Sequence, residues 1–212
     1  MDMALRPSGR SGPLAVNLPV FAKYYVENAW TWEFMALSRA RVVAGSSSDF
    51  NQRVSGVVFE QLRSKDFGQN LAHDILDMHT RLARDKPALG FWDIKGKPGG
   101  LRDIEFIAQF FVLDHKLIDD DTSTISMLER AGSLKTITQQ QIKTLIEITV
   151  RYQSLLQLLK LAAQGDYESN QFSSSFKTLL TKHSKFNSFK ELEVQLQKDA
   201  ANVGNLFSKI IG

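Results

Sequence analysis

The order of apolar and polar residues along the chain predicts a mostly helical protein. Over residues 18–44 apolar side chains recur every three or four positions, which is the spacing of one helix face, and Gly45 follows as a candidate C-cap. We therefore expect one long helix there. The same spacing predicts further helices at about 49–64, 69–86, 101–120, 138–165, 172–183 and 188–210.

Polar side chains at matching offsets support several of these helices. Asp77 and Arg81 stand four residues apart, so we expect them to pair on the outer face of their helix. Two other pairs have the three-residue offset of a capping box, in which each side chain bonds the other residue's backbone amide. These pairs are Thr138 with Gln141 and Ser188 with Glu191.

Two short segments carry the only signals for extended structure. Residues 1–16 hold prolines and glycines between short apolar pieces, which favours two strands joined by a turn. Residues 89–95, "LGFWDIK", favour a short strand or an extended segment that a turn at 95–100 closes. The predicted fold is mainly α: a small β remnant followed by six or seven helices packed as a bundle.

Composition and charge narrow the class of protein. With 212 residues, 43% of them apolar, the chain can bury a real core, and 26 basic against 23 acidic residues form no concentrated basic tract, so nucleic acid is not an expected partner. The sequence has no cysteine, which excludes disulfides and zinc–thiolate sites and suits a reducing cytosol. No apolar run approaches the length of a membrane span, so we expect no membrane contact and a cytoplasmic location.

The stretch "KGKPGGLRDIEF", residues 95–106, is the first candidate for chemistry. Gly99 and Gly100 precede a predicted helix, where exposed amides favour an anion, and Lys95 and Lys97 add positive charge. A phosphate can be accommodated by such an arrangement. The alternative is an ordinary turn and helix start without a ligand.

Two acidic residues follow in the same helix. Asp103 and Glu105 are two positions apart, so on a helix of 3.6 residues per turn they point about 200° from each other and cannot chelate one metal together. One of them is expected to face a site while the other serves packing or capping. In the alternative interpretation both complement the helix dipole.

The opening segment is the second candidate. Asp2 lies on a predicted strand and is followed by Arg6, Ser8 and Arg10 in a turn of small residues. A strand carboxylate beside arginines suits a magnesium–phosphate site, since Mg²⁺ takes one or two carboxylates plus substrate phosphates. The alternative is a solvated aspartate near a terminus.

Three stretches taken in order resemble the adenylyltransferases of glutamine synthetase (glutamate-ammonia-ligase adenylyltransferases). They are "DMALRPSGRSGPLAV", "FAKYYVENAWTWEFMALSRARVVAG" and "WDIKGKPGGLRDIEFIAQF". The resemblance spans residues 2–45 and 92–113, roughly a third of the chain. The sequence "AWTWE" resembles the C-terminal half of these proteins, which adenylylates, more than the N-terminal half, which removes AMP.

The resemblance implies an enzyme with a nucleotidyltransferase domain of the DNA polymerase β type, followed by an all-helical domain. We expect the boundary between residues 1–46 and 47–212. In that family three carboxylates hold two Mg²⁺ ions, and the aspartate of the "D-M-x-L-R-P" stretch, here Asp2, is the third. A tyrosine hydroxyl of the target then attacks the α-phosphate of ATP, and pyrophosphate leaves.

The resemblance also implies that glutamine synthetase is the partner and indicates which residues contact the nucleotide. The expected nucleotide contacts are Arg6, Ser8, Lys95, Gly99, Gly100, Asp103 and Glu105. Ala4 departs from the basic residue expected in many relatives, and the first two carboxylates are expected upstream of Met1, so the chain alone is expected to be inactive.

Two other functions compete with the enzyme interpretation. The first is a non-catalytic helical module that binds glutamine synthetase or the nitrogen-signalling protein PII. The second sets the family resemblance aside: the chain is then a generic helical domain that binds RNA or a protein partner.

Overall fold

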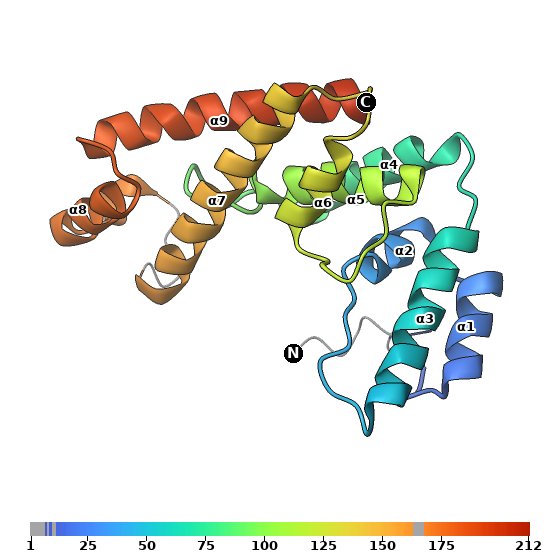
Figure 1. Ribbon diagram of the computed structural model, residues 1–212. Helices are drawn as coiled ribbons and strands as arrows, with labels where there is room; N and C mark the ends of the chain where they lie inside the picture. Colours follow the sequence, from blue (N-terminus) through green and yellow to red (C-terminus); the bar gives the residue numbers. More distant parts are fainter. Residues whose placement is uncertain (1–6, 8, 10–11, 163–167) are drawn as a thin grey trace.

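The computed structural model describes residues 7, 9, 12–162 and 168–212. In these ranges the structure has nine α-helices and no β-strand, which confirms a mainly α protein (Figure 1). The helices are α1 (Leu18–Glu27), α2 (Thr31–Leu37), α3 (Ser48–Ser64), α4 (Asn70–Asp85), α5 (Leu101–His115), α6 (Thr124–Ala131), α7 (Gln139–Ala162), α8 (Ser174–His183) and α9 (Phe189–Ile210). The α/β remnant expected at the start is not shown, since most of residues 1–11 lie outside the described ranges.

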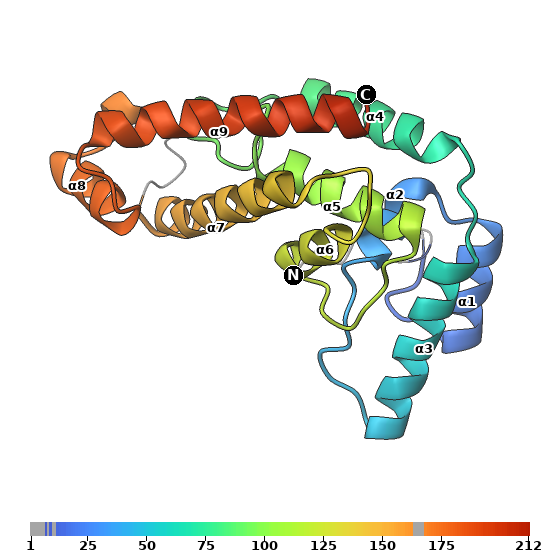
Figure 2. The same ribbon diagram turned by 45° about the horizontal axis from the view of Figure 1, so that its top comes forward.

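The helices are arranged around α5. Helices α1 and α3 lie side by side at one end, and the short α2 lies between this pair and helices α4 and α5 (Figure 1). Helices α4 and α9 run along one side of the molecule over α5 and α7 (Figure 2). Ten of the fifteen residues of α5 are buried, so this helix forms the centre of the core. None of the described helices is long and apolar enough to cross a membrane.

The prediction of a single helix over residues 18–44 is wrong. The chain leaves helix α1 after Glu27 and begins α2 at Thr31, and no helix covers residues 38–44. The cause is Glu33, whose carboxylate accepts hydrogen bonds from the backbone amide of Trp30 at 2.9 Å and from the Tyr24 hydroxyl at 2.7 Å. Glu33 is buried, so its bonds to Trp30 and Tyr24 fix a helix start within the apolar pattern.

The helix expected over 101–120 also ends earlier, at His115. Lys116 has a φ of 56°, the left-handed conformation that terminates helices. Its side chain donates to the carbonyls of Leu62, at 3.2 Å, and Lys65, so it caps the carboxyl end of α3. Helix α6 was not predicted, because its eight residues, capped by Ser123, follow a run of aspartates that hides the apolar spacing.

Other local predictions are confirmed. Arg81 and Asp77 pair at 2.7 Å on the exposed face of α4. Thr138 and Gln141 form the expected reciprocal capping box, with bonds of 2.9 and 3.2 Å. At the start of α9 the hydroxyl of Ser188 accepts from the Glu191 amide at 3.1 Å. The Glu191 carboxylate bonds the amide before Ser188 rather than that of Ser188 itself.

Residues 89–95 are neither strand nor extended chain. They form consecutive tight turns, with the Asp93 amide bonded to the Gly90 carbonyl at 3.1 Å and the Lys97 amide bonded to the Asp93 carbonyl at 3.0 Å. The carboxylate of Asp93 accepts from the Gly96 amide at 2.8 Å, which stabilises the turns. We call residues 89–100 the turn segment.

Helix α9 packs directly on the turn segment at Gly99. Gly99 has a φ of 70°, and a Cβ atom there would lie 2.0 Å from the backbone oxygen of Ala200 in α9. A side chain at this position is excluded both by its backbone conformation and by the neighbouring helix. The contact therefore requires glycine.

Replacing Gly99 with alanine should destabilise the protein by roughly 2–4 kcal/mol, because α9 must move off the turn segment and the residue must adopt a strained φ. The free energy of unfolding in urea measures this effect. The matched control is Gly56→Ala in the middle of α3, where a Cβ meets nothing within 4 Å. We expect this control to be neutral or stabilising by up to about 1 kcal/mol. Equal stability of Gly99→Ala and the parent would contradict the packing argument.

Candidate functional site

Four helices meet at the turn segment and the first residues of α5. His79 of α4, Tyr152 of α7 and Ala200 of α9 all touch this region. The turn segment also holds Trp92, which is fully buried and whose indole donates to Glu193 of α9 at 3.3 Å. The junction of α4, α5, α7 and α9 thus contains Gly99 and Asp103, two of the residues that the sequence singled out at 95–105.

Asp103 is the polar centre of this junction. The residue is only 4% exposed, and its two carboxylate oxygens accept different bonds. The oxygen Oδ1 lies 2.9 Å from His79 Nε2, and Oδ2 accepts from the Gly99 amide at 2.7 Å. Asp103 therefore caps the first turn of its own helix and links it to α4.

His79 extends this link to a third helix. Its ring packs against Phe207 of α9, with 4.6 Å between ring centroids, and lies near the ring of Phe106 at 6.2 Å. The histidine thus bonds Asp103 through Nε2 while its ring is held between apolar partners. The sequence analysis did not identify this partner of Asp103.

Glu105 points elsewhere, as the helical spacing predicts. Its Oε1 lies 3.2 Å from Arg39 Nη1, just beyond the end of α2. The Glu105 side chain is 12% exposed and that of Arg39 42% exposed. Asp103 and Glu105 therefore serve two different contacts of α5 and share no partner.

Lys97 is enclosed by aromatic rings. Its ammonium lies 4.6 Å from the ring centre of Phe91 and 5.5 Å from that of Tyr152, and it has no hydrogen-bond acceptor among the described residues. Burial lowers the pKa of Lys97 to about 8, against the opposing effect of the carboxylates of Asp199 and Asp93. Lys95, by contrast, is exposed. Of the two lysines, Lys95 is the one that solvent or a ligand reaches.

A second buried carboxylate, Asp199 of α9, escaped the sequence analysis. It is 2% exposed and accepts hydrogen bonds from Arg151 of α7 and from Gln195, the latter at 2.8 Å. A signal was present, since Asp199 falls on the apolar stripe of α9 between Leu196 and Val203. A carboxylate on such a stripe predicts a buried partner.

Close contacts explain the two glycines at the end of the turn segment, Gly99 and Gly100. Gly99 touches α9, and a Cβ on Gly100 would lie 2.7 Å from the Lys97 carbonyl oxygen and 2.8 Å from that of Ile94. The amide of Gly99 is already bonded to Asp103. Binding of a phosphate by these glycines stays a prediction. Asp2, Arg6 and Ser8 lie outside the described residues.

No group of three or more His, Cys, Asp or Glu side chains that could hold a metal occurs in the described part of the chain.

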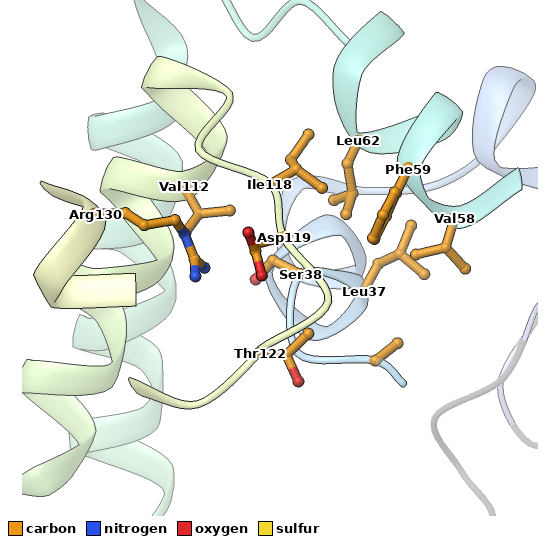
Figure 3. Close-up of a pocket in the computed structure, with 11 residues that line it drawn as sticks. Leu37, Ser38, Val58, Phe59, Leu62, Val112, Ile118, Asp119, Thr122 and Arg130 are labelled. Atoms are coloured by element: carbon orange, nitrogen blue, oxygen red, sulfur yellow. The ribbon is translucent and has the colours of Figure 1, made fainter. Parts of the chain in front are cut away.

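A small pocket lies between α2, α3, the segment after α5 and Arg130 of α6 (Figure 3). Its volume of about 10 Å³ corresponds to roughly one water molecule. This pocket does not accommodate a nucleotide.

Replacing Lys97 with methionine should stabilise the protein at pH 7 by up to about 3 kcal/mol, because the variant removes a buried charge and keeps the volume. The sign follows from the lowered pKa. Between about pH 8 and pH 10.5 the unfolded chain holds a proton that the folded chain has lost, so Lys97 makes stability rise with pH in that window. The difference between the two stability curves should therefore shrink from pH 8 upward.

Unfolding titrations across this pH range measure that difference. Lys95→Met, at the exposed neighbour, is the control and should change stability by no more than about 0.5 kcal/mol. A Lys97→Met variant that is less stable than the parent at pH 7 would show that the contacts of the ammonium with the rings outweigh its loss of solvation.

Comparison with known proteins identifies two regions. Residues 1–56 match the family model described as glutamate-ammonia ligase adenylyltransferase, and residues 69–211, more than half of the chain, match the one described as GlnD PII-uridylyltransferase. The first region includes α1 and α2, and the second begins just before α4.

Several curated bacterial proteins are similar over the whole chain. Each is named bifunctional glutamine synthetase adenylyltransferase/adenylyl-removing enzyme. Identity is 34% to the protein of Bradyrhizobium diazoefficiens, 36% to that of Xanthobacter autotrophicus and 35% to that of Caulobacter vibrioides.

In all three comparisons 100% of this chain is aligned, and it spans 21–22% of the length of the relatives. The chain is thus similar along its whole length to proteins named for glutamine synthetase adenylylation, and the match over residues 69–211 places it in the family described as GlnD PII-uridylyltransferase.

Proposed function

We propose that the chain is part of an enzyme that transfers AMP from ATP to a tyrosine hydroxyl of glutamine synthetase and thereby regulates nitrogen assimilation. The supporting observation is similarity along the entire chain to proteins named for this activity. That similarity extends over the whole length of the chain and is not confined to one motif. The same function fits a cytoplasmic location, because ATP and glutamine synthetase are used there.

In this proposal Asp2 supplies one ligand of the Mg²⁺ ions that bind ATP, and Arg6 and Ser8 contact its phosphates. Mg²⁺ prefers carboxylate and phosphate oxygens, and two such ions can stabilise the attacking and leaving oxygens of a phosphoryl transfer. The family resemblance places the other carboxylate ligands upstream of Asp2, and the described residues hold no group of three or more His, Cys, Asp or Glu side chains that could bind a metal. The chain by itself would then be inactive.

The junction around Asp103 supports the nucleotide site from the helical side. Lys95 is exposed and is the proposed phosphate contact of the turn segment. Gly99, Gly100 and Asp103 hold that segment against α4 and α9, so they would act on the nucleotide through its position. Glu105 would act in the same way through its partner Arg39.

A second candidate function is a non-catalytic module that binds glutamine synthetase or PII. The observation in its favour is that residues 69–211 match a model described as a PII-uridylyltransferase. Proteins that differ in the reaction they perform thus share this helical region, which suits a role in binding more than in chemistry. The two candidates agree for an intact enzyme and differ for the isolated chain.

The isolated chain should transfer no measurable AMP to glutamine synthetase in the presence of ATP and Mg²⁺, because one proposed metal ligand cannot assemble a two-metal site. Incorporation of radiolabelled AMP measures this. Calorimetric titrations with Mg²⁺–ATP and with glutamine synthetase separate the two candidates. Only the binding module predicts that the isolated chain releases or absorbs heat when glutamine synthetase is added without Mg²⁺–ATP. Robust AMP transfer by the isolated chain would contradict the assigned role of Asp2.

In a full-length adenylyltransferase that contains this region, Asp2→Asn should lower kcat by on the order of 10²-fold or more, because the variant weakens the stabilisation of charge at the metal ions. Steady-state kinetics with glutamine synthetase as substrate measure the effect. Asp85→Asn, at the exposed end of α4, is the matched control and should leave kcat unchanged. Similar kcat values for the two variants would count against metal binding by Asp2.

A further inference from the structure

Helix α2 connects the two regions that match different families. It belongs to the region that ends at residue 56, yet it packs against α4 and α5 of the region that begins at residue 69 (Figure 1). At seven residues it is the shortest of the described α-helices. Contacts of α2 therefore help to place the two regions relative to each other.

Polar contacts hold α2 to the second region at both of its ends. Thr31, its first residue, donates from its hydroxyl to Asp74 of α4. Beyond its last turn, Arg39 pairs with Glu105 of α5 at 3.2 Å, and its carbonyl accepts from the hydroxyl of Thr122 at 3.3 Å. The ion pair has an unequal environment, since Glu105 is largely buried and Arg39 is partly exposed.

One buried ring of α2, that of Phe34, reaches the first region. Phe34 is 1% exposed and packs edge-on against Tyr25 of α1, with 5.2 Å between ring centroids. It makes a similar contact with Phe67, just after α3, at 5.4 Å. A shift of α2 on α5 would therefore carry α1 and the end of α3 with it, because packed aromatic rings transmit displacement.

Energy alone does not explain why an ion pair lies here. A partly exposed pair contributes little to stability, and an apolar contact would hold α2 as well. Arg39, however, has two contacts with the second region, the ion pair of its side chain with Glu105 and the bond from Thr122 to its backbone carbonyl, and two contacts at one residue fix its orientation as well as its distance. Orientation is the property that a link between two functional regions needs.

We propose that Arg39 is a positioning residue, which through Glu105 orients α2, and with it the first region, on the helical region so that the adenylylation site is assembled. Only the part of this inference that concerns the rate of adenylylation, its kinetic arm, rests on the proposed function. The structural arm, the dependence of α1 and α3 on the Arg39–Glu105 pair, is independent of any activity.

The test uses Arg39→Gln, Glu105→Gln and the charge-swapped double variant R39E/E105R in the full-length adenylyltransferase. Hydrogen–deuterium exchange is measured for the amides of α1, α3 and α9. Each single variant should raise exchange in α1 and α3 by about threefold or more and leave α9 unchanged, and the swap should restore most of the protection. In the kinetic arm, kcat should fall by a similar factor while KM for ATP stays constant.

Asp77→Asn is the matched control, since it breaks the Arg81–Asp77 pair that lies within α4 and spans no regions. It should alter neither exchange in α1 and α3 nor kcat. Unchanged exchange in Arg39→Gln, or an equal effect of Asp77→Asn, would overturn the inference. Failure of the swap to restore protection would also overturn it. An inactive parent enzyme would refute the proposed function and leave the exchange result to decide on Arg39.

Discussion

The arrangement of the helices depends on one buried carboxylate. Asp103 bonds His79 of α4 and the amide of Gly99, and the Phe207 ring of α9 lies against His79. A buried carboxylate is costly unless its oxygens are bonded, so this position specifies its partners as well as stabilising them. That requirement orients the turn segment and α4 directly, and α9 through the ring of His79.

A second layer of organisation lies around α2. The helix α5 holds the bundle through Asp103 on one face and reaches α2 through Glu105 on another, two residues further along. One helix thus contacts both the bundle interior and the preceding region, with a single carboxylate for each. A third contact is made by the Lys116 ammonium, which follows the end of α5 and donates to carbonyls at the end of α3.

The sequence predicted features that depend on neighbouring residues. The apolar spacing located most helices, the offset from Thr138 to Gln141 located a helix start, and the offset from Asp103 to Glu105 predicted that the two carboxylates diverge. Features that depend on distant residues were not predicted. The division of α1 from α2 needs the burial of Glu33 beside Tyr24, which no local pattern contains.

The candidate site was only partly predictable for the same reason. The sequence pointed to the turn segment and to Asp103, but the partner of Asp103 is 24 residues away in α4, and that of Asp199 is 48 residues away in α7. Lys97 was taken as a charge beside a phosphate, and of its two aromatic neighbours Phe91 belongs to the turn segment whereas Tyr152 comes from the distant helix α7. The family resemblance over residues 2–45 and 92–113 was confirmed by similarity along the whole chain.

The three tryptophans have very different environments, which gives the molecule a built-in optical reporter. Trp92 is fully buried and stacks on Phe189 of α9, at 5.3 Å between ring centroids, whereas Trp30 is 72% and Trp32 42% exposed. Movement of α9 away from the turn segment would expose the face of the Trp92 ring that Phe189 covers. The blue-shifted part of the intrinsic fluorescence therefore reports the docking of the last helix, and the red-shifted part comes from the surface of α2.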